Sequence, residues 1–109
     1  FGPHTDASFF TVIACTGGGG SSLEILCPED GWRAVDELVS DGVSVVVFPG
    51  DFMSIISDDK IPATVHRATP GSTGEDRISV PILFRAESSV HWPCKVHGML
   101  DCEEAVALL

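Results

Sequence analysis

Residues 4–15 read HTDASFFTVIAC, and this stretch brings a strand and two metal-ligand types together. Residues 8–15 are rich in β-branched and aromatic side chains, which is typical of a β-strand. Just before them, His4 and Asp6 stand two positions apart, so their side chains point the same way on an extended chain. One metal ion can then take a nitrogen and an oxygen from a single segment. The stretch therefore predicts a strand that starts beside a metal site.

Turn residues divide the rest of the chain into short segments. We expect further strands at residues 23–27, 32–35, 43–48, 52–56, 63–68 and 78–85, and a PEDG turn makes the first two a hairpin. Such spacing is typical of an all-β sandwich or jelly roll. A short C-terminal helix is expected over residues 100–109, where Asp101 and Glu104 have the spacing of a capping box.

The strand at residues 78–85 has two different faces. One face carries Ser79, Pro81 and Leu83, and the other carries Ile78, Val80, Ile82 and Phe84. An entirely apolar face should be covered, but nothing else in the 109 residues looks long enough to cover it. We therefore expect a fragment whose jelly roll is incomplete at its N-terminus, with a covering segment of the same protein missing upstream.

Composition excludes some classes of partner. The chain has 6 Lys and Arg against 16 Asp and Glu, a net charge of −10, which argues against nucleic acid and against an anionic membrane surface. No apolar run approaches the roughly 20 residues of a membrane helix, and no secretory signal is visible. Without such a signal the four cysteines are expected to stay reduced, which indicates a cytoplasmic protein.

Three later residues complete a candidate site. A jelly roll can place His66 opposite the His4 and Asp6 pair, and two histidines with one carboxylate are the mark of non-haem Fe(II) oxygenases. Arg77 and Ser79 are again two positions apart, and a guanidinium beside a hydroxyl suits an organic acid. Taken singly, His66 is more simply explained as a histidine of a strand and Arg77 as a solvated surface charge. The evidence for a site therefore lies in the order and spacing of these residues.

From about residue 2 to residue 85, the chain resembles the isopenicillin N synthase-like 2-oxoglutarate/Fe(II) oxygenases, with its motifs in the same order as theirs. HTDASFFTVI is similar to their HTDxxxLTLL segment, and RISVPILF to their RxSxxxF strand. The segments LEIL…GWRAV, VVVFPGD and ATVHRA match their GLQV…W..V hairpin, VVNxGD turn and xxxHRV segment. Phe48 stands where the family usually has Asn, and the chain has no Tyr to supply the family's cosubstrate-binding tyrosine.

The resemblance implies an oxidoreductase in which His4, Asp6 and His66 hold Fe(II), while Arg77 and Ser79 hold 2-oxoglutarate. Such an enzyme uses dioxygen to oxidise, most simply to hydroxylate, a small-molecule substrate, and it releases succinate and CO2. Residues 1–86 would then form the catalytic core and residues 87–109 a tail. The alternatives are a truncated or non-catalytic jelly-roll module that retains the ligands, and a metal-bound jelly roll of cupin type. His91, Cys94, His97 and Cys102 are a further, weaker candidate for structural zinc.

Overall fold

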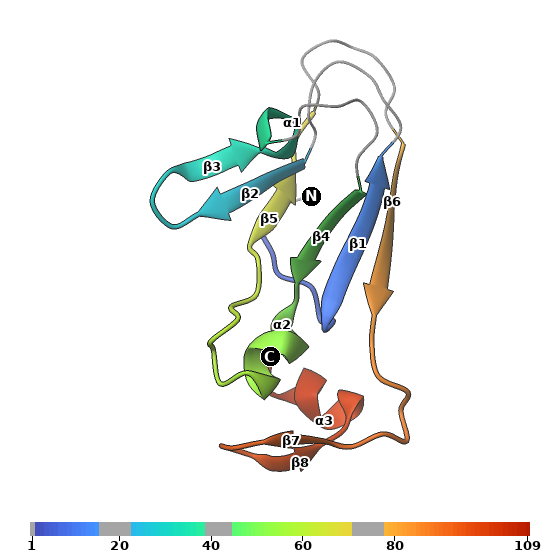
Figure 1. Ribbon diagram of the computed structural model, residues 1–109. Coiled ribbons are helices and arrows are strands. Elements are labelled where there is room, and N and C mark those ends of the chain that lie inside the picture. The colour runs from blue at the N-terminus through green and yellow to red at the C-terminus, as the bar shows by residue number, and fades with distance from the viewer. Residues whose placement is uncertain (1, 16–22, 39–44, 71–77) are drawn as a thin grey trace.

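The computed structural model describes residues 2–15, 23–38, 45–70 and 78–109 of the chain. Its described elements, in chain order, are β1 (Phe10–Cys15), β2 (Leu23–Cys27), β3 (Gly31–Ala34), α1 (Val35–Leu38), β4 (Val45–Pro49), α2 (Asp51–Ile56), β5 (His66–Ala68), β6 (Ser79–Phe84), β7 (Trp92–Cys94), β8 (Gly98–Leu100) and α3 (Cys102–Ala107). Two three-stranded antiparallel sheets have the strand orders β4-β1-β6 and β3-β2-β5, and β7 pairs with β8. The two large sheets stand side by side in Figure 1, and α2, α3 and the β7–β8 hairpin gather at one end.

The sheet β4-β1-β6 has an outer face made only of apolar residues. Residues directly opposite each other on antiparallel strands share a face. The register pairs Phe10, Val12 and Ala14 of β1 with Pro49, Val47 and Val45 of β4, and with Phe84, Ile82 and Val80 of β6. Val47 is 60% exposed and Ile82 is 51% exposed. The described part of the chain therefore leaves this face in solvent, as the alternation in β6 predicts.

The outer face of the sheet β3-β2-β5 carries an ion pair. Glu24 of β2 lies opposite Arg67 of β5, and the Arg67 Nε donates a hydrogen bond to Glu24 Oε2 at 2.5 Å. The Arg67 guanidinium also lies 4.1 Å from the ring centroid of Trp32 in β3, a cation–π contact. This face is therefore mixed, because Leu26, opposite Trp32, is also 43% exposed on it.

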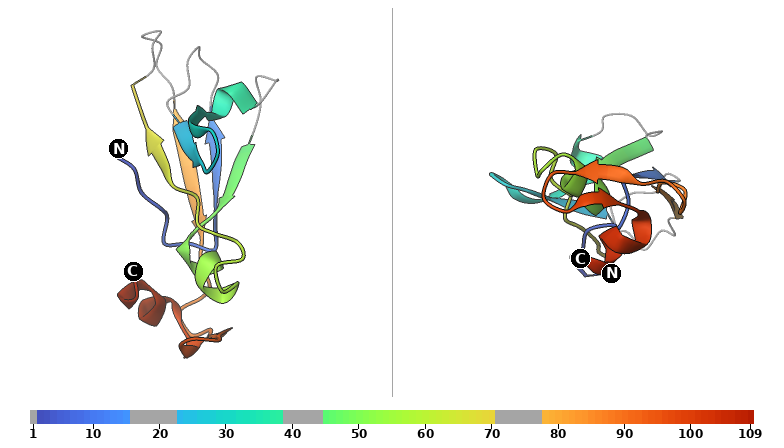
Figure 2. Two further views of the ribbon diagram at one scale, coloured as in Figure 1. Left: turned by 90° about the vertical axis from the view of Figure 1, so that its left-hand side faces the viewer. Right: turned by 90° about the horizontal axis from the view of Figure 1, so that it is seen from below.

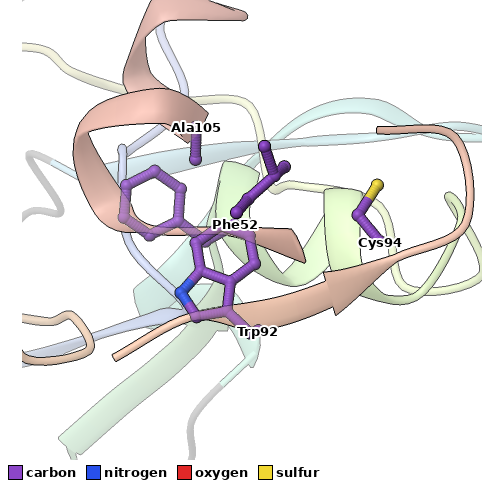
Figure 3. Close-up of a cluster of buried hydrophobic side chains, with 5 residues drawn as sticks. Phe52, Trp92, Cys94 and Ala105 are labelled. Atoms are coloured by element: carbon purple, nitrogen blue, oxygen red, sulfur yellow. The ribbon is translucent and has the colours of Figure 1, made fainter. Parts of the chain in front are cut away.

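Two apolar clusters form the core. Ile13, Leu23, Val35 and Phe48 fill the space between the two sheets, with contributions from both of them. The second cluster lies at the end formed by α2, α3 and the hairpin, and it contains Phe52, Trp92, Cys94, Leu100 and Ala105. The side chains of Phe52 and Trp92 lie together beneath α3 (Figure 3). Seen from below in Figure 2, the hairpin and α3 cover this end of the molecule.

The structure corrects one predicted element, because residues 52–56 are helical in α2 and do not form a strand. Phe52 is fully buried, and Ile55 and Ile56 pack against the same cluster. Spacings of three and four residues place side chains on one face of a helix and on both faces of a strand. The apolar pattern at 52, 55 and 56 is therefore a helical one that the strand prediction missed.

Other predicted elements are confirmed with small shifts in their bounds. β2 and β3 form the expected hairpin, and Gly31 at its turn has a φ of +73°. The C-terminal helix is shorter than expected, but its capping box is present, because Asp101 accepts from the Glu104 N–H while Glu104 accepts from the Asp101 N–H. The β7–β8 hairpin, in what was expected to be a tail, is an addition. No helix among the described residues is long and apolar enough to span a membrane.

Candidate metal centre

The segment before β1 pairs directly with β5 through its histidine. The His4 N–H donates to the His66 carbonyl oxygen at 3.0 Å, and the His66 N–H donates to the His4 carbonyl oxygen at 3.0 Å. This isolated bridge brings the centroids of the two imidazoles to 4.2 Å. Residues far apart in sequence are thereby held side by side, as the metal-site prediction requires.

Backbone carbonyls set the tautomer of both imidazoles. The His4 Nδ1 lies 2.8 Å from the Gly2 carbonyl oxygen, and the His66 Nδ1 lies 3.1 Å from the Thr64 carbonyl oxygen. A carbonyl oxygen can only accept, so Nδ1 carries the hydrogen in each ring. The neutral rings then present an unprotonated Nε2, which is the form that binds a metal.

Asp6 completes the cluster. Its Oδ1 lies 3.6 Å from the Nε2 of His4 and 3.6 Å from the Nε2 of His66. These separations are too long for hydrogen bonds, and the three ligand atoms lie within 4.8 Å of one another. The side chains of His66 and Asp6 are 7% and 12% exposed. The His4 side chain is more open, at 38% exposed. Two imidazoles and a carboxylate that converge in this way are a donor set that fits a divalent transition metal.

Buried groups behind the ligands hold them in place. The ring of Phe48, the residue that departs from the resemblance, lies 4.6 Å from the His66 ring. The Thr11 hydroxyl donates to Asp6 Oδ2 at 2.6 Å, and the Ser8 hydroxyl lies 3.1 Å from that of Thr11. The sequence analysis gave no role to Thr11 or Ser8. Two polar residues at the start of a strand that enters the core could have indicated one.

A cavity of about 280 Å³ opens beside the three ligand candidates. Its other walls come from both sheets, with Leu23 and Ala68 from β3-β2-β5 and Ile13, Ser79, Pro81 and Leu83 from β4-β1-β6. Ser79, one of the two predicted organic-acid residues, therefore lies on the same cavity as His4, Asp6 and His66. Arg77, its predicted partner, lies outside the described residues.

The zinc hypothesis finds no support in the arrangement of its four residues. The Cys94 thiol is directed to the Ile55 carbonyl oxygen, and the Cys102 thiol to that of Ala86. His91 lies near Asp101 and Glu104. Both of those carboxylates cap the start of α3. Within the described ranges, the two histidines and two cysteines do not converge on one point.

Comparisons with known proteins agree with this geometry. A family model described as the 2OG-Fe(II) oxygenase superfamily matches residues 1–86. Gibberellin 3-beta-dioxygenase 4 of Arabidopsis thaliana is 38% identical over 81 residues, which are 74% of this chain and 21% of the relative. 1-Aminocyclopropane-1-carboxylate oxidase homolog 4 of the same plant is 36% identical over 96 residues, which are 84% of this chain and 26% of the relative.

Solved structures support the same fold. The crystal structure of a full-length Neurospora crassa protein in complex with alpha-KG superimposes with a TM-score of 0.75 at 21% identity, over 98% of this chain and 36% of that one. This likeness confirms the jelly-roll fold. The chain spans about a quarter of the length of the two Arabidopsis relatives.

Proposed function

Because the chain belongs to the 2OG-Fe(II) oxygenase superfamily, we propose that it carries the catalytic core of an Fe(II)- and 2-oxoglutarate-dependent dioxygenase that oxidises a small organic molecule. The single observation that carries this proposal is the convergence of Asp6 Oδ1 with the Nε2 atoms of His4 and His66. Residues 1–86 form the proposed core, and residues 87–109 follow it. The protein is proposed to act in the cytoplasm, where its described thiols at Cys27, Cys94 and Cys102 would stay reduced.

His4, Asp6 and His66 are the residues that would hold Fe(II). Bound there, the metal would supply the redox chemistry by which dioxygen and 2-oxoglutarate are consumed, with release of succinate and CO2. The protein would position the metal ligands. The Gly2 and Thr64 carbonyl oxygens orient the two imidazoles, and Phe48 packs against the His66 ring. Three ligands on one side leave the cavity side open to the cosubstrate.

Ser79 and Arg77 are the proposed anchor for the distal carboxylate of 2-oxoglutarate. Ser79 starts β6 on the cavity that the metal ligands share. A cavity of about 280 Å³ is suited to a small acid of this kind. Arg77 precedes Ser79 by two positions, and its guanidinium would supply the charge that pairs with the carboxylate.

We also propose that a segment of the same protein, upstream of Phe1, covers the outer face of the sheet β4-β1-β6. Val45, Val47, Val80, Ile82 and Phe84 are between 44% and 60% exposed there. A face of this kind is normally buried. The relatives and the solved structure are about three to five times as long as the part of each that matches this chain. Their additional length is consistent with such a segment.

The test uses the intact protein that contains this chain. It should form succinate from 2-oxoglutarate only with Fe(II), and His66→Ala should abolish that activity together with metal binding. His97→Ala is the matched control, because that histidine lies outside the metal cluster, and it should leave both unchanged. Binding of neither Fe(II) nor 2-oxoglutarate by the intact protein would leave the non-catalytic module as the better description.

A second variant separates the cosubstrate from the metal. Arg77→Ala should weaken 2-oxoglutarate binding by at least tenfold while sparing metal affinity, because the guanidinium is proposed to contact only the acid. Isothermal titration with 2-oxoglutarate and with Co(II) as a stable substitute for Fe(II) measures the two affinities. Equal loss of both would contradict the assigned role.

A further inference from the structure

A buried chain of two hydroxyls ends on one oxygen of Asp6. The side chains of Ser8 and Thr11 are fully buried. The Thr11 Oγ1 lies 2.6 Å from Asp6 Oδ2, which is the short distance of a charge-assisted hydrogen bond. We propose that Thr11 is a positioning residue that reserves Asp6 Oδ2 for a hydrogen bond and so leaves Oδ1 as the only metal-binding oxygen. This inference rests on the proposed metal centre and adds to it the mode of carboxylate binding.

The hydrogen-bond directions follow from the number of hydrogens. A hydroxyl has one hydrogen to donate, and that of Thr11 is used on the carboxylate. In the contact of 3.1 Å between the two hydroxyls, Ser8 must therefore be the donor. The order is Ser8 to Thr11 to Asp6, with each hydrogen directed toward the negative charge. Each such bond also polarises the next one and strengthens it.

The backbone of Asp6 is fixed by the same turn. Its carbonyl oxygen accepts the N–H groups of Ser8 at 2.9 Å and of Asp51 at 2.8 Å. Gly50 packs so closely that a Cβ on it would lie 2.4 Å from the Ser8 Oγ and 2.5 Å from the Asp6 carbonyl oxygen. Asp6 is therefore held at its backbone by this turn and at its carboxylate by Thr11.

The two carboxylate oxygens consequently have separate tasks. Oδ2 faces Thr11 in the protein interior, and Oδ1 faces the two imidazoles. A carboxylate that turned to bind with both oxygens would take a second position on the metal. Holding Oδ2 away would keep that position free for the exchangeable ligands that the proposed function needs.

The experiment compares Thr11→Val, which keeps the shape and loses the hydroxyl, with Thr11→Ser, which keeps the hydroxyl. Both are made in the intact protein and titrated with Co(II), whose visible absorption reports the coordination of the metal. Thr11→Val should weaken Co(II) binding about 10- to 100-fold, the usual effect of losing a partner of a metal ligand, and should change the absorption spectrum. Thr11→Ser should restore both to within about threefold of the unmodified protein, and unchanged affinity and spectrum in Thr11→Val would overturn the proposal.

Ser8→Ala keeps the test decisive if Thr11→Val does not fold. It removes the donor to Thr11 without touching the carboxylate, so a loss of a few-fold in Co(II) affinity is expected. No change in Ser8→Ala would then overturn the hydroxyl chain. Failure of the proposed function is read separately, because an unmodified protein that binds Co(II) but forms no succinate with Fe(II) and 2-oxoglutarate would refute that function and leave the comparison of the variants intact.

Discussion

Gly50→Ala adds a single methyl group where β4 ends and α2 begins, and it tests how tightly the candidate site is built. The added Cβ would lie 2.4 Å from both the Ser8 carbonyl oxygen and Ser8 Oγ, and 2.5 Å from the Asp6 carbonyl oxygen. Real contacts of a Cβ essentially never fall below 3.0 Å. Two of the three opposing atoms are backbone, so the clash cannot be relieved by rotating a side chain.

Two opposing terms set the size of the effect. Gly50 has a φ of −107° and a ψ of −172°, an extended conformation that alanine adopts freely. Restricting the unfolded chain would therefore stabilise the variant by about 0.4–1 kcal/mol. Forcing a methyl into packed backbone costs about 1–3 kcal/mol, and more where nothing can move. The net expectation is a loss of about 1–2 kcal/mol in the free energy of unfolding, with weaker metal binding because Asp6 is displaced.

Urea unfolding of the intact protein and titration with Co(II) measure these two effects, and two other glycines provide controls. Gly2→Ala meets nothing within 4 Å and should be neutral. Gly31 also has open space but a φ of +73°, so Gly31→Ala should cost about 1 kcal/mol through its backbone alone and leave metal affinity unchanged. A Gly50→Ala protein as stable as the unmodified one, with full metal affinity, would refute the close-packed description of this turn.

Two more substitutions test the core and the outer face. Phe52→Ala removes a fully buried ring in contact with Phe9 and Trp92, and urea unfolding should show a loss of about 3–5 kcal/mol; a loss below about 1 kcal/mol would contradict its central place in the cluster. Ile82→Asp should destabilise the intact protein by more than about 2 kcal/mol if the outer face is covered there, whereas Val96→Asp, at a side chain 77% exposed, should have little effect. Equal, small effects of the two aspartates would count against the covering segment.

Local chemistry explains why much of the fold could be predicted from the sequence. The β2–β3 hairpin follows from a four-residue turn that ends in Gly31, and the cap of α3 follows from Asp101 and Glu104. The alternation of β6 predicts its exposed face, with Ile82 directed outward. In each case the residues that decide the structure are neighbours in sequence, so no knowledge of distant contacts is needed.

What the sequence did not predict depends on contacts between distant segments. α2 was expected as a strand although the spacing of its apolar residues is helical, and the cluster that this face packs against includes Trp92 of the later hairpin, a partner that the sequence does not locate. The sequence pattern identified His4, Asp6 and His66 as candidate ligands. The structure brings them together through a backbone bridge between the two histidines, which the sequence pattern does not predict. Thr11 and Ser8 were missed because their burial and their contact with Asp6 follow only from the folded chain.

Asp6 links parts of the molecule that would otherwise act independently. Its carboxylate faces the metal ligands, while its carbonyl oxygen receives the N–H of Asp51, the first residue of α2. The next residue, Phe52, has its ring centroid 5.5 Å from that of Trp92. An ion bound at Asp6 only in the folded chain would add its binding free energy to the stability of the whole chain, including a cluster that it does not touch.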